Sequence, residues 1–133
     1  MGVRVIVDSA SDVADRYREK LKVVPLTVCF GEEDYLDGII FISFSLENMI
    51  DLRAMLPRQA CQYLTTEYSA ELLETLCKYH LDVDMHYRAL TEENVREMHE
   101  HGIRVNAWTC DKPEEALELV KWGVDYITSN ILE

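Results

Sequence analysis

Residues 103–128, IRVNAWTCDKPEEALELVKWGVDYIT, decide the fold class of this chain. The apolar run at 103–109 has the length of a strand, and the apolar residues of 111–122 have helical spacing. Asp111 is placed to cap this helix, Pro113 suits its first turn, and Gly123 stands where the helix should end. A second apolar run follows at 126–128. Strand, helix and strand in this order predict a parallel strand pair joined by a crossover helix.

The same alternation extends outward through the whole chain. Strands are predicted at 3–7, 23–30, 39–43, 60–64, 83–87, 103–109 and 126–128, and helices at 11–21, 45–56, 69–80, 91–101 and 111–122. Seven strands alternating with five helices predict an α/β fold with a parallel sheet. The sheet is either a partial (β/α) barrel or an open flavodoxin-like sheet, and the sequence leaves both possibilities open.

The size, charge and cysteine content narrow the class of protein. A chain of 133 residues suits one domain, 1–133, with one core. The net charge of −12 argues against nucleic acid or an anionic membrane as a partner, because a negative surface neutralises neither. The four widely spaced cysteines favour reduced thiols, and the start of the chain does not resemble a signal peptide. We therefore expect a cytoplasmic protein, and the absence of any cofactor fingerprint predicts no cofactor.

One connection departs from the alternation. Residues 31–38, GEEDYLDG, form a polar loop between the predicted strands 23–30 and 39–43. Eight residues are too few for the usual crossover between parallel strands, which takes about a dozen or more. An irregular junction is therefore predicted near Gly38.

Three motifs before this junction resemble a known family. They are VIVDSASD at 5–12, VPLTV at 24–28 and YLDG at 35–38. Residues 3–38 resemble the N-terminus of the DegV family, bacterial fatty-acid-binding proteins that present acyl groups to a kinase. The resemblance implies a DegV-like βαβ unit over 1–38. The later segments with which that family holds the fatty-acid carboxylate have no counterpart in this chain.

Residues 39–133 resemble a second family. The motifs are ISFSLE at 42–47, LT at 90–91, HEHGIRV at 99–105, AWT at 107–109, PEE at 113–115 and GVDYITSN at 123–130. They are similar to the C-terminal part of the glycerophosphodiester phosphodiesterases, metal-dependent hydrolases with a (β/α) barrel. By this resemblance the first half of the barrel is absent, and with it the family's metal ligands, its second catalytic histidine and its Glu-x-Lys strand.

Together the two resemblances predict an engineered or recombined chimera, a de novo protein made from two α/β fragments. Because the metal-binding half is absent, we expect a structural scaffold that is not an enzyme, with no catalytic residue and no metal. Two alternatives stay open. One is a glycerophosphodiester phosphodiesterase-like metal-dependent hydrolase, and the other is a small-anion or fatty-acyl binding module.

Side chains at the carboxyl ends of the predicted strands are the candidates for ligand binding, because ligands of parallel α/β proteins collect there. These candidates are Ser9, His86, Trp108, Thr109 and Asn130. By resemblance, Trp108 would lie over the glycerol or phosphate side of a phosphodiesterase pocket, although a rim aromatic without a ligand is the plainer interpretation. His86 shares one strand face with Asp82 and Asp84, which permits a metal site. The ligand itself is unknown.

The strand count also bears on assembly. A closed parallel barrel needs about eight strands, and this chain offers seven. The first and last strands, 3–7 and 126–128, would lack partners on one side, and unpaired strand edges readily recruit a second chain. We therefore predict a homodimer that buries edge strands or apolar helix faces.

Overall fold

The computed structural model describes residues 7–8 and 39–131 of the chain. In these residues six parallel strands form one sheet. The strands are β1 (Val7–Asp8), β2 (Ile40–Ser43), β3 (Ala60–Thr65), β4 (Asp82–His86), β5 (Val105–Trp108) and β6 (Tyr126–Ile127). The predicted strand 23–30 and the junction near Gly38 lie outside the described residues. The prediction of a single domain over 1–133 likewise stays a prediction.

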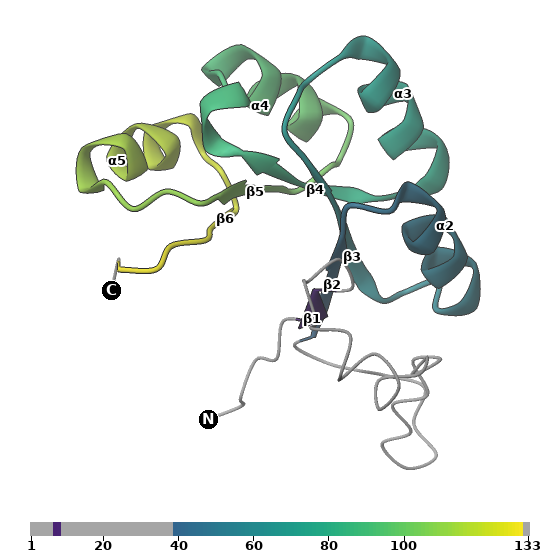
Figure 1. Ribbon diagram of the computed structural model, residues 1–133. Helices are drawn as coiled ribbons and strands as arrows, with labels where there is room; N and C mark the ends of the chain where they lie inside the picture. The colour runs from purple at the N-terminus through teal and green to yellow at the C-terminus, as the bar shows by residue number, and fades with distance from the viewer. Residues whose placement is uncertain (1–6, 9–38, 132–133) are drawn as a thin grey trace.

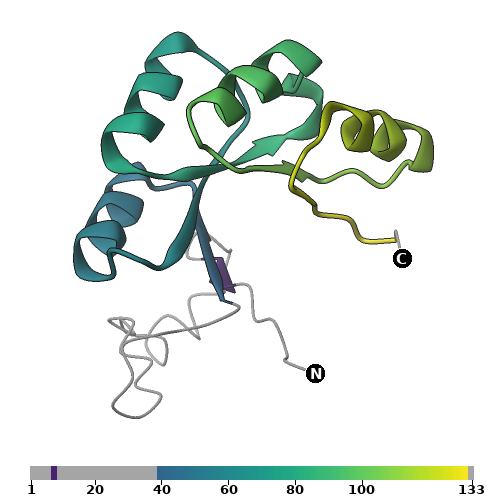
Figure 2. The same ribbon diagram turned by 180° about the vertical axis from the view of Figure 1, so that it is seen from behind.

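Four α-helices alternate with these strands. They are α2 (Leu46–Met55), α3 (Ala70–Tyr79), α4 (Glu92–Glu100) and α5 (Pro113–Trp122), and a short 3-10 helix, η1 (Tyr87–Ala89), follows β4. All four α-helices lie around one side of the curved sheet, as Figures 1 and 2 show from opposite directions. The predicted α/β fold with a parallel sheet is confirmed.

The strand order separates the two architectures that the sequence left open. Each strand pairs with the strand before it in the chain, in the order β1-β2-β3-β4-β5-β6. A flavodoxin-like sheet reverses direction at a switch point and places helices on both faces, whereas a (β/α) barrel keeps sequential order with helices outside. The described residues therefore form a partial (β/α) barrel.

The helix boundaries follow local capping rules at three of the four helices. Ser45, Ser69 and Thr91 each accept a hydrogen bond from the backbone N–H three residues later, at 3.2, 3.0 and 3.2 Å. Gly123 ends α5 with a left-handed φ of 84°, as the sequence predicts. The prediction for the start of α5 is wrong, because Lys112 and not Asp111 occupies the N-cap position. The Asp111 carboxylate has other partners, described below.

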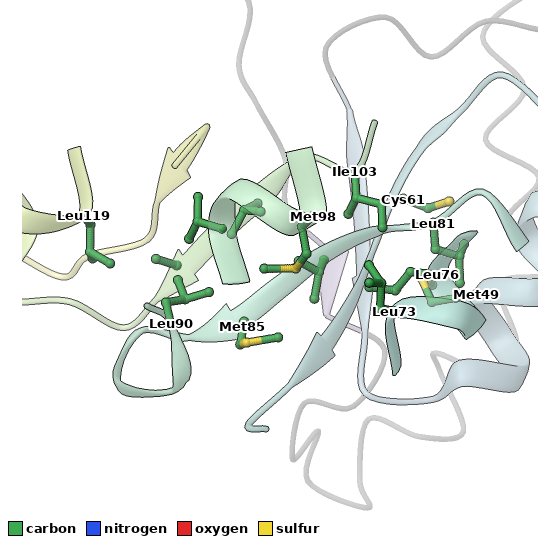
Figure 3. Close-up of a cluster of buried hydrophobic side chains, with 14 of the residues drawn as sticks. Met49, Cys61, Leu73, Leu76, Leu81, Met85, Leu90, Met98, Ile103 and Leu119 are labelled. Atoms are coloured by element: carbon green, nitrogen blue, oxygen red, sulfur yellow. The ribbon is translucent and has the colours of Figure 1, made fainter. Parts of the chain in front are cut away.

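The core lies between the sheet and the helices. Cys61, Val83 and Val105 point from neighbouring strands toward the helices and are fully buried, and Leu76 and Met98 meet them from α3 and α4. Figure 3 shows part of this cluster with its labelled side chains. Burying each large apolar side chain contributes roughly 1.5–3 kcal/mol. The core therefore occupies the helix side of the sheet and leaves the inner, concave face to other residues.

No helix in the described ranges has the length and apolar character that crossing a membrane requires.

Candidate functional site

The concave face of the sheet carries buried polar side chains. Gln62, Asp84 and Asn106 occupy central positions of β3, β4 and β5 and expose only 1%, 2% and 5% of their surface. Their chain neighbours Val83 and Val105 belong to the core on the helix side, so strand alternation places the polar side chains on the opposite face. A polar layer thus crosses three strands where a barrel interior would be.

Hydrogen bonds join this layer across the sheet. The Asn106 Nδ2 donates to Gln62 Oε1 at 3.1 Å, and the Thr128 hydroxyl donates to Asn106 Oδ1 at 3.3 Å. Both bonds fix the orientation of the Asn106 amide, because its nitrogen donates on one side and its oxygen accepts on the other. The layer therefore presents oriented polar groups from β3 to the segment after β6.

Asp84 is the exception within the layer. Its Oδ1 is buried, and no described residue donates a hydrogen bond to it. Burial raises the pKa of the Asp84 carboxyl to about 7, because the low-dielectric surroundings disfavour the charged form. Leu64 and Asn106 lie beside it in register on the adjacent strands. This carboxyl can therefore hold or release a proton near neutral pH.

An aromatic group stands at the carboxyl ends of the strands. His86 and Trp108 are partners in register, and their rings meet edge to face with centroids 5.2 Å apart. Phe44, which follows β2, also meets Trp108 edge to face, with ring centroids 5.7 Å apart. The indole Nε1 of Trp108 also donates to the backbone oxygen of Asp84 at 3.0 Å. These three contacts hold Trp108 in one orientation over the rim.

The ring nitrogens of His86 have distinct roles. Nδ1 accepts a hydrogen bond of 3.4 Å from the backbone N–H of Arg88, at the start of η1. An accepting Nδ1 places the proton of the neutral imidazole on Nε2. His86 can therefore donate a hydrogen bond from Nε2 to an anionic or carbonyl oxygen.

A second polar group joins the last two loops of the rim. The Asp111 carboxylate accepts hydrogen bonds from the Ser129 hydroxyl at 3.0 Å, the Asn130 backbone N–H at 2.7 Å and the Asn130 Nδ2 at 2.9 Å. These bonds, chiefly those from Asn130, lower the pKa of Asp111. Asp111 thus fixes the segment after β6 instead of capping α5.

The structure unites some of the predicted site residues and separates others. His86 and Trp108 come together, while Asn130 is held by Asp111. Thr109 follows Trp108 and is half-buried, and Ser9 lies outside the described residues.

The sequence reasoning did not identify the buried layer of Gln62, Asn106 and Thr128. Gln62 and Asn106 are polar residues in the middle of apolar strands, and that is the signal that marks them.

Comparison with protein families decides what this chain is related to. The model of the glycerophosphoryl diester phosphodiesterase family matches residues 7–132. The chain belongs to this family. It is 28% identical over 105 residues to the glycerophosphodiester phosphodiesterase of Bacillus subtilis (strain 168), a match that covers 75% of this chain and 36% of that protein. The chain therefore spans about a third of the length of this relative.

Solved structures of phosphodiesterases share the fold. A putative glycerophosphodiester phosphodiesterase from Galdieria sulphuraria superimposes with a TM-score of 0.63 at 26% identity, over 71% of this chain and 41% of that one. One from Parabacteroides distasonis gives 0.61 at 27% identity, over 69% and 39%. A phosphodiesterase from Oleispira antarctica, solved in complex with the product sn-glycerol-3-phosphate, gives 0.63 at 23% identity, over 68% and 37%.

The family membership corrects two predictions. The expectation that the chain is not an enzyme is wrong, because the family and its solved members are phosphodiesterases. The interpretation as a scaffold without inherited activity loses its support for the same reason. The DegV resemblance of residues 3–38 lies almost wholly outside the described residues, and the family match begins within that segment, at residue 7. The DegV resemblance and the chimera stay predictions.

The divalent cation that the phosphodiesterase resemblance implies does not fit the described residues alone. Within 7–8 and 39–131, no three His, Cys, Asp or Glu side chains are grouped so that they could hold a metal ion. Asp82, which shares a strand face with Asp84 and His86, accepts the Arg104 backbone N–H at 2.9 Å and pairs with its Nε at 3.5 Å. A hard cation takes about six oxygen ligands, so the described residues could supply only part of the ligand set.

Proposed function

We propose that this chain forms part of a glycerophosphodiester phosphodiesterase barrel and contributes the wall that holds the glycerophosphate side of the substrate. The observation that carries the proposal is the rim of the partial barrel. There Trp108 is fixed by His86, Phe44 and the Asp84 backbone, directly above a buried polar layer. The superposition on solved phosphodiesterases supports the part of the proposal that places this chain in a phosphodiesterase barrel.

The chemistry of the rim suits the two ends of such a substrate. The apolar faces of Trp108 and Phe44 can pack against the carbon atoms of glycerol, and Phe44 is 45% exposed and therefore accessible. The His86 Nε2–H can donate to a phosphoryl oxygen. In the proposed reaction a water oxygen bonds to phosphorus and the phosphorus–alcohol bond breaks. One water proton passes to the alcohol oxygen, the other stays on the phosphate or passes to solvent, and glycerol phosphate remains.

Binding of the product tests the proposed wall. We expect sn-glycerol 3-phosphate to shift the NMR signal of the Trp108 indole N–H and the ring signals of His86. The Trp122 indole, in the last turn of α5, serves as the internal control and should stay in place. Trp108→Ala should weaken binding at least about tenfold, since a buried aromatic contact contributes about 1.5 kcal/mol or more. Unchanged Trp108 and His86 signals at millimolar product would contradict the proposal.

Hydrolysis is tested separately. Purified chain is incubated with glycerophosphocholine and calcium or magnesium, and release of sn-glycerol 3-phosphate is measured with and without a chelator. We expect release that the chelator abolishes and that Trp108→Ala reduces. Binding without release would assign the chain the glycerophosphate wall but not the complete catalytic site.

A further inference from the structure

The Asp84 carboxyl lies beneath the rim that carries His86 and Trp108. Asp84 and His86 are two residues apart on β4, so strand alternation places both side chains on the concave face. Two residues of a strand span about 7 Å. The backbone oxygen of Asp84 also accepts the Trp108 indole N–H at 3.0 Å, which keeps the indole next to this position. A ligand held by His86 and Trp108 therefore lies within about 10 Å of the Asp84 carboxyl.

The surroundings of Asp84 do not compensate a negative charge. Asp84 exposes 2% of its surface, and its Oδ1 accepts no hydrogen bond from any residue in the described ranges. Its register partners on the adjacent strands, Leu64 and Asn106, are uncharged. The Asn106 amide already bonds to Gln62 and Thr128. When Asp84 ionises, its charge therefore acts on the rim without a partner among the described residues to weaken it.

Three titratable or charged side chains belong to the same region of β4 and β5. His86 lies on the rim side of Asp84, and Asp82 lies on the opposite side along β4. Asp82 holds the third, the Arg104 guanidinium, with an N–O distance of 3.5 Å. Burial raises the pKa of the Asp84 carboxyl to about 7. Asp84 therefore changes its charge as the pH crosses neutrality.

The substrate and the product of the proposed reaction differ in charge. The phosphate of a glycerophosphodiester carries one negative charge. The product is a phosphate monoester, whose second pKa is about 6, so its phosphate carries nearly two negative charges above pH 7. Repulsion by a fixed negative charge is proportional to the charge of the ligand. An ionised Asp84 therefore weakens binding of the monoester more than binding of the diester.

We propose that Asp84 is a specificity-determining residue of the rim, whose negative charge favours the singly charged phosphodiester over the doubly charged monoester product. The inference rests on the proposed function, because it requires the phosphate to bind beside His86 and Trp108. Asp84 acts across the concave face through its charge and does not itself contact the ligand. The discrimination is absent in acid, where the carboxyl is protonated, and present in mild alkali. It favours release of the product over release of the substrate.

Binding of two ligands to the full chain at fixed pH tests the discrimination. The ring C–H NMR signals of Trp108 report the Kd of sn-glycerol 3-phosphate and of glycerophosphoglycerol, with a chelator present to prevent metal-dependent turnover. At pH 8.5 the ratio of the monoester Kd to the diester Kd should be at least about fivefold larger in the wild type than in Asp84→Asn. A unit charge about 10 Å away has an effect of this order. At pH 5.5 the two ratios should be equal, because the Asp84 carboxyl is then uncharged.

Asp51→Asn, at an exposed position on α2, removes the same charge outside the concave face and is the matched control. Its Kd ratio should equal that of the wild type at both pH values. Circular dichroism confirms that both variants are folded. Equal ratios for the wild type and Asp84→Asn at pH 8.5, or a difference that persists at pH 5.5, would overturn the inference and leave the proposed function intact. Trp108 signals that neither ligand shifts at either pH would contradict the proposed function and the inference together.

Discussion

Three aspartates near the concave face show how surroundings set the charge of one residue type. Asp111 accepts three hydrogen bonds, and its pKa is lowered. Burial raises the pKa of Asp82, an effect that the Arg104 backbone N–H and guanidinium oppose. Asp84 is buried, no residue within 7–8 and 39–131 donates to its Oδ1, and its pKa is about 7. The Asp84 carboxyl therefore exchanges its proton near neutral pH.

Asp84→Asn tests the raised pKa of the Asp84 carboxyl through the pH dependence of stability. The folded-state pKa of about 7 lies above the unperturbed 3.8, so the folded chain keeps a proton that the unfolded chain loses. The free energy of unfolding should therefore fall as pH rises from about 4 to 7, by up to about 4 kcal/mol from this group. In Asp84→Asn that decrease should be absent.

Urea denaturation at pH 4.5, 6 and 8 measures the effect. Asp51→Asn, an exposed position on α2, is the control and should retain the wild-type slope. Parallel slopes for the wild type and Asp84→Asn would show that the Asp84 carboxyl has an ordinary pKa.

At the scale of the element, the helices differ in the hydrogen bonds that the free backbone N–H groups of their first turn make. At α4, Thr91 and Asn94 form a reciprocal capping box, with hydrogen bonds of 3.2 and 2.9 Å. At α5 the N-cap is Lys112, whose backbone is extended as a cap requires but whose side chain cannot accept a hydrogen bond. The exposed N–H groups of α5 are therefore less well satisfied than those of α4.

Lys112→Ser should stabilise the chain, because serine at the N-cap accepts a hydrogen bond from the first turn of α5. The expected gain in the free energy of unfolding is about 0.5–1 kcal/mol, measured by urea denaturation. Lys78→Ser, in the last turn of α3, exchanges the same residue types away from an N-cap and should give no gain. Equal changes in both variants would contradict the capping argument.

At the scale of the whole molecule, the sheet is stabilised unevenly. β3, β4 and β5 have a strand on each side and contribute fully buried side chains, whereas β6 has two residues and β1 two. Native-state hydrogen exchange should therefore be slowest in β3 to β5 and faster in β6 by at least about tenfold. Equal protection in β4 and β6 would show that the sheet opens only as one unit.

The sequence predicted the elements of this fold better than their assembly. Alternating patterns located the strands and helices of 39–131. Periodicity carries no information on strand order, so the sequence did not distinguish a barrel from an open sheet. Gln62, Asp84 and Asn106 are about twenty residues apart, and only the strand register brings them together. Asp111 matches the residue type and position of a helix N-cap. Its carboxylate instead accepts hydrogen bonds from Ser129 and Asn130, which are distant in sequence and which local patterns do not reveal.

The sequential strand order also has a consequence for synthesis on the ribosome. Each described strand from β3 onward pairs with a strand that was translated about twenty residues earlier, and no pairing waits for a later segment to pass between them. Contacts so close in sequence close short loops, which lowers the entropy that folding must overcome. The growing chain can therefore add one strand and one helix at a time as they emerge, in the order in which they are translated.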